Sequence, residues 1–210
     1  MSLLEDLSKS LQAGNVEEVK NGVKEGLEGG YEPRELLYDG LMDGMGIIGE
    51  KFKNNEVFVP EVLIAARAMN AGMEILKPKL IETGVEDIGK VIIGTVAGDL
   101  HDIGKNLVKM MFEGSGFEVI DLGTDVTPEE FANAVKEHKP DIVGLSALLT
   151  TTMPVMEKVV KKLEEEGIRD DVIVMIGGAP ITEKYCQDIK ADIYAKDAAT
   201  AASTAKEKVS

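Results

Sequence analysis

Histidine and aspartate are the residue types in this chain best suited to hold a metal ion, and they meet in one segment. His101 follows a short apolar run, and Asp99 stands two positions before it. A carboxylate that accepts a proton from one ring nitrogen fixes the tautomer of a histidine and makes the other nitrogen a better metal ligand. The pair therefore predicts a metal-ligating histidine, although the same residues also fit an ordinary polar loop. The second histidine, His138, lies in a polar segment that is typical of an exposed helix end.

Two later segments carry groups that can face a ligand. Ser146, Thr150 and Thr152 bring hydroxyl groups that can donate to a carboxylate or a ligand, or cap the helix expected after them. Gly177 and Gly178 end another apolar run, where missing side chains either let a flat group approach the backbone or form a tight turn. Each segment follows an apolar run, so all of them would meet at one edge of a parallel sheet.

The elements that position these residues follow two patterns, and the first is helical. Up to about residue 82, apolar residues recur at intervals of three and four, which is typical of amphipathic helices. The four apolar stripes cover residues 3–11, 16–27, 37–52 and 62–80. Glycine and asparagine separate these stripes, as expected of turns between helices. Four helices with short connections predict a small four-helix bundle.

The second pattern begins after residue 89 and alternates short β-branched runs with helical stretches. The expected strands are 91–96, 117–120, 142–145, 172–176 and 192–194, and the expected helices are 104–113, 127–138, 152–166, 182–189 and 197–208. Five strand–helix units predict an open parallel sheet with helices on both faces, whose ligands bind beyond the carboxyl ends of the strands. We therefore expect a helical domain at 1–86 and an α/β domain at 87–210.

Composition limits the functional classes. The chain has 38 acidic and 23 basic residues, and this net charge of −15 argues against binding nucleic acid. No apolar run approaches the ~18 residues of a membrane span, and the first residues lack the basic segment of a signal peptide. A single cysteine, Cys186, excludes an intrachain disulfide. We expect a protein of a reducing compartment, the cytoplasm, that contacts neither membrane nor nucleic acid.

The spacing of the polar segments resembles a known cofactor motif. Asp99-x-His101-x-x-Gly104 is followed after 41 residues by Ser146-x-Leu148, and after 28 more by Gly177-Gly178. This pattern resembles the motif of corrinoid proteins that bind cobalamin base-off and His-on. The helical half resembles the cap domain of the corrinoid methyl carriers and of cobalamin-dependent methionine synthase. The resemblance covers nearly the whole chain and implies an α + α/β protein, with a flavodoxin-like (Rossmann-like) five-stranded sheet behind the four-helix bundle.

The resemblance implies which residues hold the cobalt and cover the cofactor. His101 would ligate cobalt from the lower face and displace the cofactor's own dimethylbenzimidazole base. Asp99 would bond the far nitrogen of His101, with Thr152 as a third member behind it. Phe58 stands before a proline at the start of the last bundle helix, so it would pack on the upper face. Met69 would assist Phe58, although both residues also fit the bundle core.

The nucleotide tail would follow the later segments. The residues expected to contact it are Ser146, Leu148, Thr150, Gly177 and Gly178. The two glycines would be required because a Cβ at either position would occupy the path of the displaced base. Gly104 would let the loop turn beneath the tail into the following helix.

The function implied by the resemblance is that of a corrinoid protein that carries a methyl group. Its cofactor would alternate between methylcobalamin and cob(I)alamin. A substrate-specific corrinoid methyltransferase would load it from a methylated amine, betaine, methanol or methoxylated aromatic compound. A second methyltransferase would pass the methyl group to tetrahydrofolate or a thiol, and a reductive activase is a third expected partner. The sequence contains no separate substrate barrel, so we expect a carrier and not a complete enzyme.

Three other functions fit parts of the sequence. An adenosylcobalamin-binding module of a mutase or a sensor would share the cofactor motif. His101-Asp102 also resembles the signature of metal-dependent HD-type phosphohydrolases, whose all-helical sites need several histidines and aspartates. A flavodoxin-like domain that has lost cofactor binding is the remaining alternative.

Overall fold

The structure, a computed structural model, describes residues 2–84 and 87–209. It divides into two compact units, Met1–Asp87 with Gly114–Gly116, and Ile88–Glu113 with Phe117–Ser210. The expected domain boundary at residue 86 lies outside the described residues. Within them, no helix has the length and apolar character that crossing a bilayer requires.

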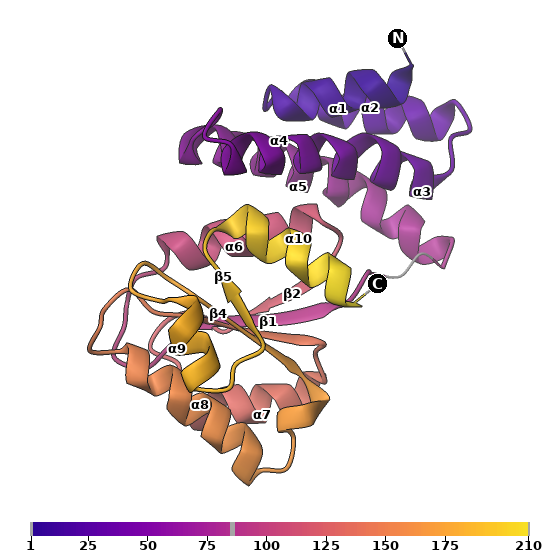
Figure 1. Cartoon of the computed structure of the whole chain (residues 1–210). Helices are drawn as coiled ribbons and strands as arrows, with labels where there is room; N and C mark the ends of the chain where they lie inside the picture. Colours follow the sequence, from indigo (N-terminus) through magenta and orange to yellow (C-terminus); the bar gives the residue numbers. More distant parts are fainter. Residues whose placement is uncertain (1, 85–86, 210) are drawn as a thin grey trace. The chain divides into compact units, whose positions relative to one another are not determined.

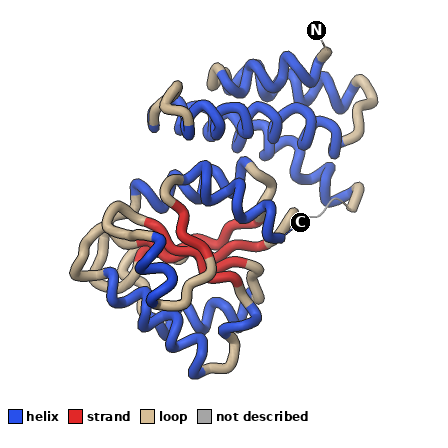
Figure 2. The backbone as a smooth tube through the Cα atoms, in the orientation of Figure 1, coloured by secondary structure: helices blue, strands red, loops and turns tan. Residues whose placement is uncertain are grey.

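The first unit consists of helices (Figures 1 and 2), which confirms the predicted helical bundle. Its elements are α1 (Leu3–Gln12), α2 (Val16–Glu28), α3 (Pro33–Glu35), η1 (Leu36–Met42), α4 (Asp43–Lys53) and α5 (Val59–Glu82). Polar side chains cap the first two helices, because Ser2 accepts a hydrogen bond from the N–H of Glu5, and Asn15 accepts one from the N–H of Glu18. The apolar stripes form the buried core, which includes Leu7, Leu11, Val19, Val23, Leu41, Met45, Ile48, Val62, Met69 and Leu76.

One segment departs from the regular helix predicted over residues 37–52. Leu36–Met42 forms a π-helix, η1, which runs directly into α4. Its wider turns still keep the apolar side chains Leu36, Leu37, Leu41 and Met42 buried. Gly40 permits close packing against α1, since a Cβ at this position would lie 2.7 Å from Cδ2 of Leu7. The apolar stripe therefore identified the buried face of this segment but not its winding.

The second unit is a parallel sheet with helices on both faces (Figures 1 and 2). Its strands are β1 (Lys90–Thr95), β2 (Glu118–Asp121), β3 (Ile142–Ser146), β4 (Ile173–Gly177) and β5 (Ile193–Ala195), in the all-parallel order β2-β1-β3-β4-β5. One face carries α6 (Ile103–Gly114) and α10 (Ala198–Val209), and the other carries α7 (Pro128–His138), α8 (Met153–Glu165) and α9 (Glu183–Asp188). A short 3-10 helix, η2 (Arg169–Asp171), precedes β4. The predicted flavodoxin-like fold is confirmed.

The strand order and register bring the ends of the central strands together. β2 lies on one side of β1 and β3 on the other, so the topological switch point lies beside β1. Thr95, Ser146 and Gly177 are neighbours across β1, β3 and β4. Buried side chains of β3 and β4 hold these strands against α7 and α8, where Phe131, Val159 and Leu163 are 0% exposed. Loops that follow the strands therefore start from a rigid edge.

Candidate functional site

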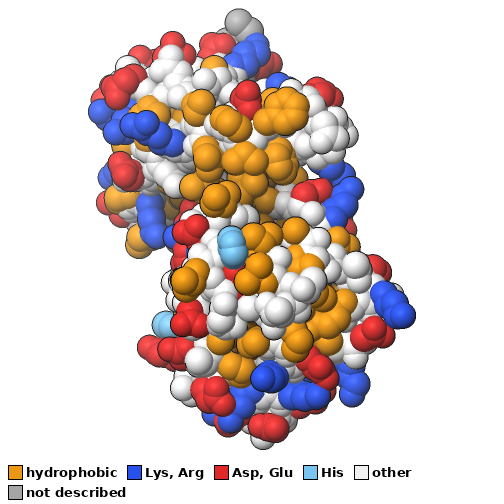
Figure 3. Space-filling view, turned by 90° about the vertical axis from the view of Figure 1, so that its left-hand side faces the viewer, with side chains coloured by type: hydrophobic (Ala, Val, Ile, Leu, Met, Phe, Trp, Pro, Cys, Tyr) orange, Lys and Arg blue, Asp and Glu red, His pale blue; other side chains and the backbone are white. Residues whose placement is uncertain are grey.

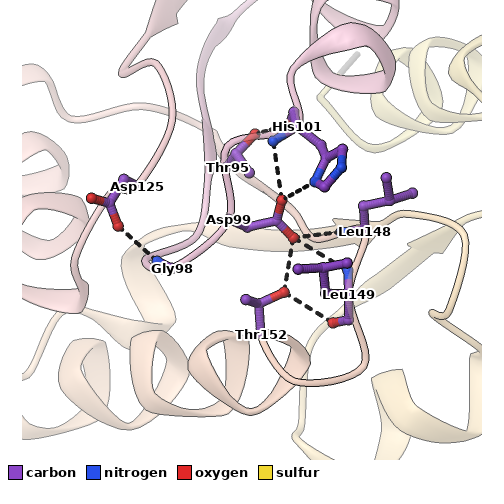
Figure 4. A network of polar contacts seen from close by, with 8 residues as sticks. All are labelled: Thr95, Gly98, Asp99, His101, Asp125, Leu148, Leu149 and Thr152. Carbon is purple, nitrogen blue, oxygen red and sulfur yellow. Dashed lines mark hydrogen bonds and ion pairs between the residues drawn. The ribbon is translucent and has the colours of Figure 1, made fainter.

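His101 lies in the loop between β1 and α6, and Asp99 holds its ring (Figure 4). Nδ1 of His101 is 2.8 Å from Oδ1 of Asp99, and the backbone N–H of His101 donates to the same oxygen at 3.1 Å. Asp99 is 0% exposed, whereas the side chain of His101 is 53% exposed. Because an ionised carboxylate only accepts hydrogen bonds, the proton of the neutral imidazole lies on Nδ1. The lone pair on Nε2 is then left for a metal ion.

The second oxygen of Asp99 is held from β3's side of the site. Oδ2 accepts from the N–H of Leu148 at 2.8 Å, from the N–H of Leu149 at 3.3 Å and from Oγ1 of Thr152 at 2.8 Å. Burial by itself would raise the pKa of Asp99. The hydrogen bonds from Leu148, His101 and Thr152 outweigh it and hold the pKa well below its usual range. Asp99 is therefore a charged acceptor at neutral pH.

Two residues that the sequence analysis missed hold the backbone of this loop. Thr95, fully buried at the end of β1, donates through Oγ1 to the carbonyl oxygen of His101 at 3.0 Å. Asp125, in the loop after β2, accepts from the N–H of Gly98 at 2.7 Å. The only available signal was positional, because Asp125 follows β2, the strand next to β1, at the same edge of the sheet. That position does not indicate which group the Asp125 carboxylate contacts.

A buried ion pair ties the first turn of α6 to the end of β2. Nζ of Lys105 is 2.6 Å from Oδ1 of Asp121 and 2.8 Å from Oδ1 of Asn106, and the side chain of Lys105 is 2% exposed. Burial would raise the pKa of Asp121, but the hydrogen bond from Lys105, the N–H of Gly123 and the charge of Lys109 lower it. The helix that follows His101 is thereby fixed to the sheet.

Apolar side chains surround the polar pair. The exposed large hydrophobic residues of this unit are Leu100 at 73%, Ile103 at 77%, Leu148 at 43% and Leu149 at 41%. Figure 3 shows hydrophobic side chains gathered on this unit. These four lie in the segments that contain His101 and the donors to Asp99. An exposed apolar rim around a polar centre is typical of a ligand surface.

The glycines differ in the reason for which they are needed. Gly104 is the second residue of α6 and does not form a turn, contrary to expectation; a Cβ there would meet no protein atom within 4 Å. Gly178 has φ +132°, and its Cβ would collide with the carbonyl oxygen of Ala147. A Cβ at Gly177 would lie 3.1 Å from the carbonyl oxygen of Ala195. The neighbouring backbone therefore requires glycine at 178, whatever ligand passes it.

The remaining sequence-predicted residues fall into two places. Ser146, half-buried, ends β3 next to Gly177, and Thr150 is exposed in the turn before α8. Hydrogen bonds join Asp99 with His101, Leu148 and Thr152, and the strand register joins Ser146 with Gly177, whose successor Gly178 packs against Ala147. Gly104 lies in the first turn of α6, and a Cβ there would contact none of the other expected residues. Phe58 and Met69 belong to the helical unit. Phe58 is 63% exposed, so it is not a core residue, whereas Met69 is 1% exposed and is one.

The location of His101 also bears on the alternative of an HD-type phosphohydrolase. That alternative requires an all-helical domain, whereas His101 and Asp102 follow a strand of a parallel sheet. Over residues 2–84 and 87–209, no group of three or more His, Cys, Asp or Glu side chains is placed to hold a metal ion. The structure gives this alternative no support.

Known proteins resemble both units of the chain. Residues 89–204 and residues 3–77 each match a family model described as a B12 binding domain. Trimethylamine corrinoid protein 1 of Methanosarcina acetivorans is 45% identical over 177 residues, which cover 83% of this chain and 82% of the relative. Dimethylamine corrinoid protein 2 of the same organism is 41% identical over 206 residues, covering 98% and 95%.

A solved structure agrees with these relatives. In the methanol:cobalamin methyltransferase complex MtaBC from Methanosarcina barkeri, one chain matches with a TM-score of 0.87 and 32% identity. The match covers 99% of the present chain and 79% of the other. On these matches and on the geometry around His101, the chain belongs to the B12-binding family of corrinoid proteins.

Proposed function

We propose that this protein carries a methyl group on the cobalt of a bound cobalamin, with His101 as the protein ligand of that cobalt. The observation that carries the proposal is the free Nε2 of His101. Its ring is held at Nδ1 by a buried, charged Asp99, and it stands half-exposed among apolar side chains. Such an arrangement is typical of a histidine whose free nitrogen binds a metal ion, here one that a large cofactor already holds.

The residues present fit a corrinoid cofactor. Leu100, Ile103 and Leu148 offer an apolar surface beside His101 that a large ring would cover. Gly104 leaves the space beside the first turn of α6 open, although neither its φ nor any neighbouring atom requires a glycine there. A glycine that the protein itself does not need supports a ligand that passes close to the backbone.

The protein residues would bind and orient the cofactor, and the bound cobalamin would supply the cobalt that accepts and releases the methyl group. His101 would hold the metal through Nε2, while Asp99 keeps the proton on Nδ1. Thr152 and the N–H groups of Leu148 and Leu149 would keep Asp99 in place when charge at the metal changes.

We further propose that the helical unit shields the methyl group. Phe58 supports this, since it stands exposed at the N-cap of α5 while most apolar residues of that helix are buried. A cap must move before a partner reaches the methyl group, so Phe58 would act in the closed state.

The partners would be a substrate-specific corrinoid methyltransferase, a second methyltransferase that delivers to tetrahydrofolate or a thiol, and a reductive activase. The names of the relatives favour a methylated amine as the methyl donor, because they are called trimethylamine and dimethylamine corrinoid proteins. Methanol is the second candidate, because the matching complex is a methanol:cobalamin methyltransferase.

Visible spectroscopy tests the proposal. The protein is incubated with hydroxocobalamin, desalted and recorded beside the variants His101→Ala and His138→Ala. The wild type and His138→Ala, which changes the histidine at the end of α7, should retain cobalamin with a histidine-ligated, base-off spectrum. His101→Ala should lose that spectrum. A wild-type protein that retains no cobalamin, or a His101→Ala spectrum identical to wild type, would refute the role of His101.

A further inference from the structure

We infer that Asp125 is a positioning residue for the His101–Asp99 pair, an inference that rests on the proposed function. Asp125 lies between β2 and α7, and Asp99 lies after β1, so the two residues lie in the loops that follow neighbouring strands. The N–H of Gly98 donates to Oδ1 of Asp125 at 2.7 Å, and the N–H of Asp125 donates to the carbonyl oxygen of Asp99 at 3.1 Å. Asp125 therefore contacts both ends of the Gly98–Asp99 dipeptide, and Figure 4 shows the contact with Gly98.

The backbone conformation of both residues supports a specific contact between Asp125 and Gly98. Asp125 has φ +59° and Gly98 has φ +83°, both in the left-handed region. Aspartate reaches that region more readily than most residues, but it still requires surrounding contacts to stay there. The adjacent bridge between Val96 and Val126 joins the same two loops, so the loop after β2 continues the sheet to the level of Asp99.

The backbone of Asp99 determines where its carboxylate can reach. Oδ1 serves His101 at 2.8 Å, and Oδ2 serves the N–H of Leu148, also at 2.8 Å. If the Asp99 backbone shifted toward His101, the distance from Oδ1 to Nδ1 of His101 would shorten and the distance from Oδ2 to the N–H of Leu148 would lengthen. By holding the N–H of Gly98 and the carbonyl oxygen of Asp99, the two ends of the dipeptide that contains the Asp99 Cα, Asp125 would set the direction of the His101 ring without touching it.

Three variants separate the effect of the Asp125 carboxylate as a hydrogen-bond acceptor from the effect of the left-handed backbone conformation at this position. Asp125→Gly keeps the left-handed conformation and removes the carboxylate. Asp125→Asn keeps an acceptor oxygen and a residue type that tolerates this conformation. Lys190→Gly is the matched control, because Lys190 also has φ +59° but lies in the turn between α9 and β5.

Hydroxocobalamin titration followed by visible spectroscopy gives the main readout. We expect Asp125→Gly to bind about 10-fold more weakly, with a smaller histidine-ligated fraction, as changes behind a metal-ligating histidine typically do. Asp125→Asn and Lys190→Gly should bind as the wild type does. If Asp125→Gly binds indistinguishably from wild type with the same spectrum, or if Asp125→Asn is equally impaired, the inference is wrong.

A measurement without cofactor separates this inference from the proposed function. In the apo protein, the Nδ1 proton of His101 should give a sharp, hydrogen-bonded NMR signal that broadens in Asp125→Gly. An unchanged signal in Asp125→Gly would overturn the inference even where the wild type binds cobalamin. Conversely, a wild type without a histidine-ligated spectrum would refute the proposed function, while the apo signal would still decide the role of Asp125.

Discussion

Replacing Asp99 by asparagine removes the charge that orders the site while keeping nearly the same shape. In the wild type, five donors reach the two carboxylate oxygens: the N–H and Nδ1 of His101, the N–H groups of Leu148 and Leu149, and Oγ1 of Thr152. Asparagine offers one acceptor oxygen and one NH₂ donor. Whichever way the amide turns, its NH₂ group faces N–H donors on one side.

The size of the effect follows from those contacts. Thr152 can turn its hydroxyl to the carbonyl oxygen of Leu149, 2.9 Å away, so its hydrogen bond is replaced. If the NH₂ group faces Leu148 and Leu149, both of their N–H groups lose an acceptor. If it faces His101, the backbone N–H of His101 loses its acceptor, and the ring must move its proton to Nε2 so that Nδ1 can accept from the amide. Hydrogen bonds to a charged group contribute about 1.5–3 kcal/mol each, so the loss of one or two of them should lower the free energy of unfolding of the α/β unit by about 2–6 kcal/mol. At about 4 °C per kcal/mol, its Tm should fall by about 8–24 °C.

Two assays test this prediction. Thermal unfolding followed by circular dichroism gives the Tm, and hydroxocobalamin titration should show binding about 10–100-fold weaker, the usual effect of losing a partner behind a ligating histidine. Asp102→Asn is the matched control, because it makes the same charge change where the carboxylate accepts from Nδ2 of Asn106 at 3.0 Å on the surface. If Asp99→Asn has the same Tm as Asp102→Asn and keeps a histidine-ligated spectrum, the carboxylate of Asp99 does not order the site.

Four further outcomes are expected. Gly178→Ala should destabilise the α/β unit by about 3 kcal/mol, because φ +132° and the adjacent backbone exclude a Cβ, which urea denaturation would measure. Gly104→Ala should raise stability by about 0.5–1 kcal/mol as a helix substitution yet weaken hydroxocobalamin binding; equal binding would mean that no ligand passes this point. Asp121→Asn should lower the free energy of unfolding by about 1–2 kcal/mol at pH 7. Because the pKa of Asp121 is lower in the native state, this difference between wild type and variant is present above the unfolded-state pKa of about 4 and disappears as the pH falls through the native pKa. Urea titrations at several pH values would show it. Burial raises the pKa of Cys186 to about 11, so iodoacetamide at pH 8 should leave it unmodified in the native protein and alkylate it in urea.

The sheet could be predicted closely because its signals are local. The β-branched runs at 91–96 and 142–145 became β1 and β3 with shifts of one residue, since a buried parallel strand must be apolar throughout. Asp99 and His101 could be assigned to the end of a strand for the same reason. Once the strands are parallel and sequential, their carboxyl ends share an edge.

The contribution of Asp125, in the loop after β2, to the His101 site could not be predicted, because it depends on a contact between loops that are distant in sequence. Nothing in the residues around Asp125 indicates that its carboxylate meets the N–H of Gly98, 27 positions earlier. The contact that requires a glycine at 178 could not be predicted either, since its neighbour Ala147 follows another strand, and the expected passage of the displaced base stays a prediction. The π-helix η1 escaped prediction because an apolar stripe marks a buried face and does not specify the winding.

The origin of the donors to Asp99 has a consequence for the order in which the protein matures. Leu148, Leu149 and Thr152 stand 49, 50 and 53 positions after the carboxylate that they hold. During synthesis, His101 leaves the ribosome well before those donors exist, so Oδ2 of the carboxylate that holds its ring lacks these three partners until β3 has paired with β1. A long-range contact of this kind forms late in folding. The nascent chain would therefore present an ordinary, mobile histidine, and the capacity to capture a cofactor would arise only with the finished sheet.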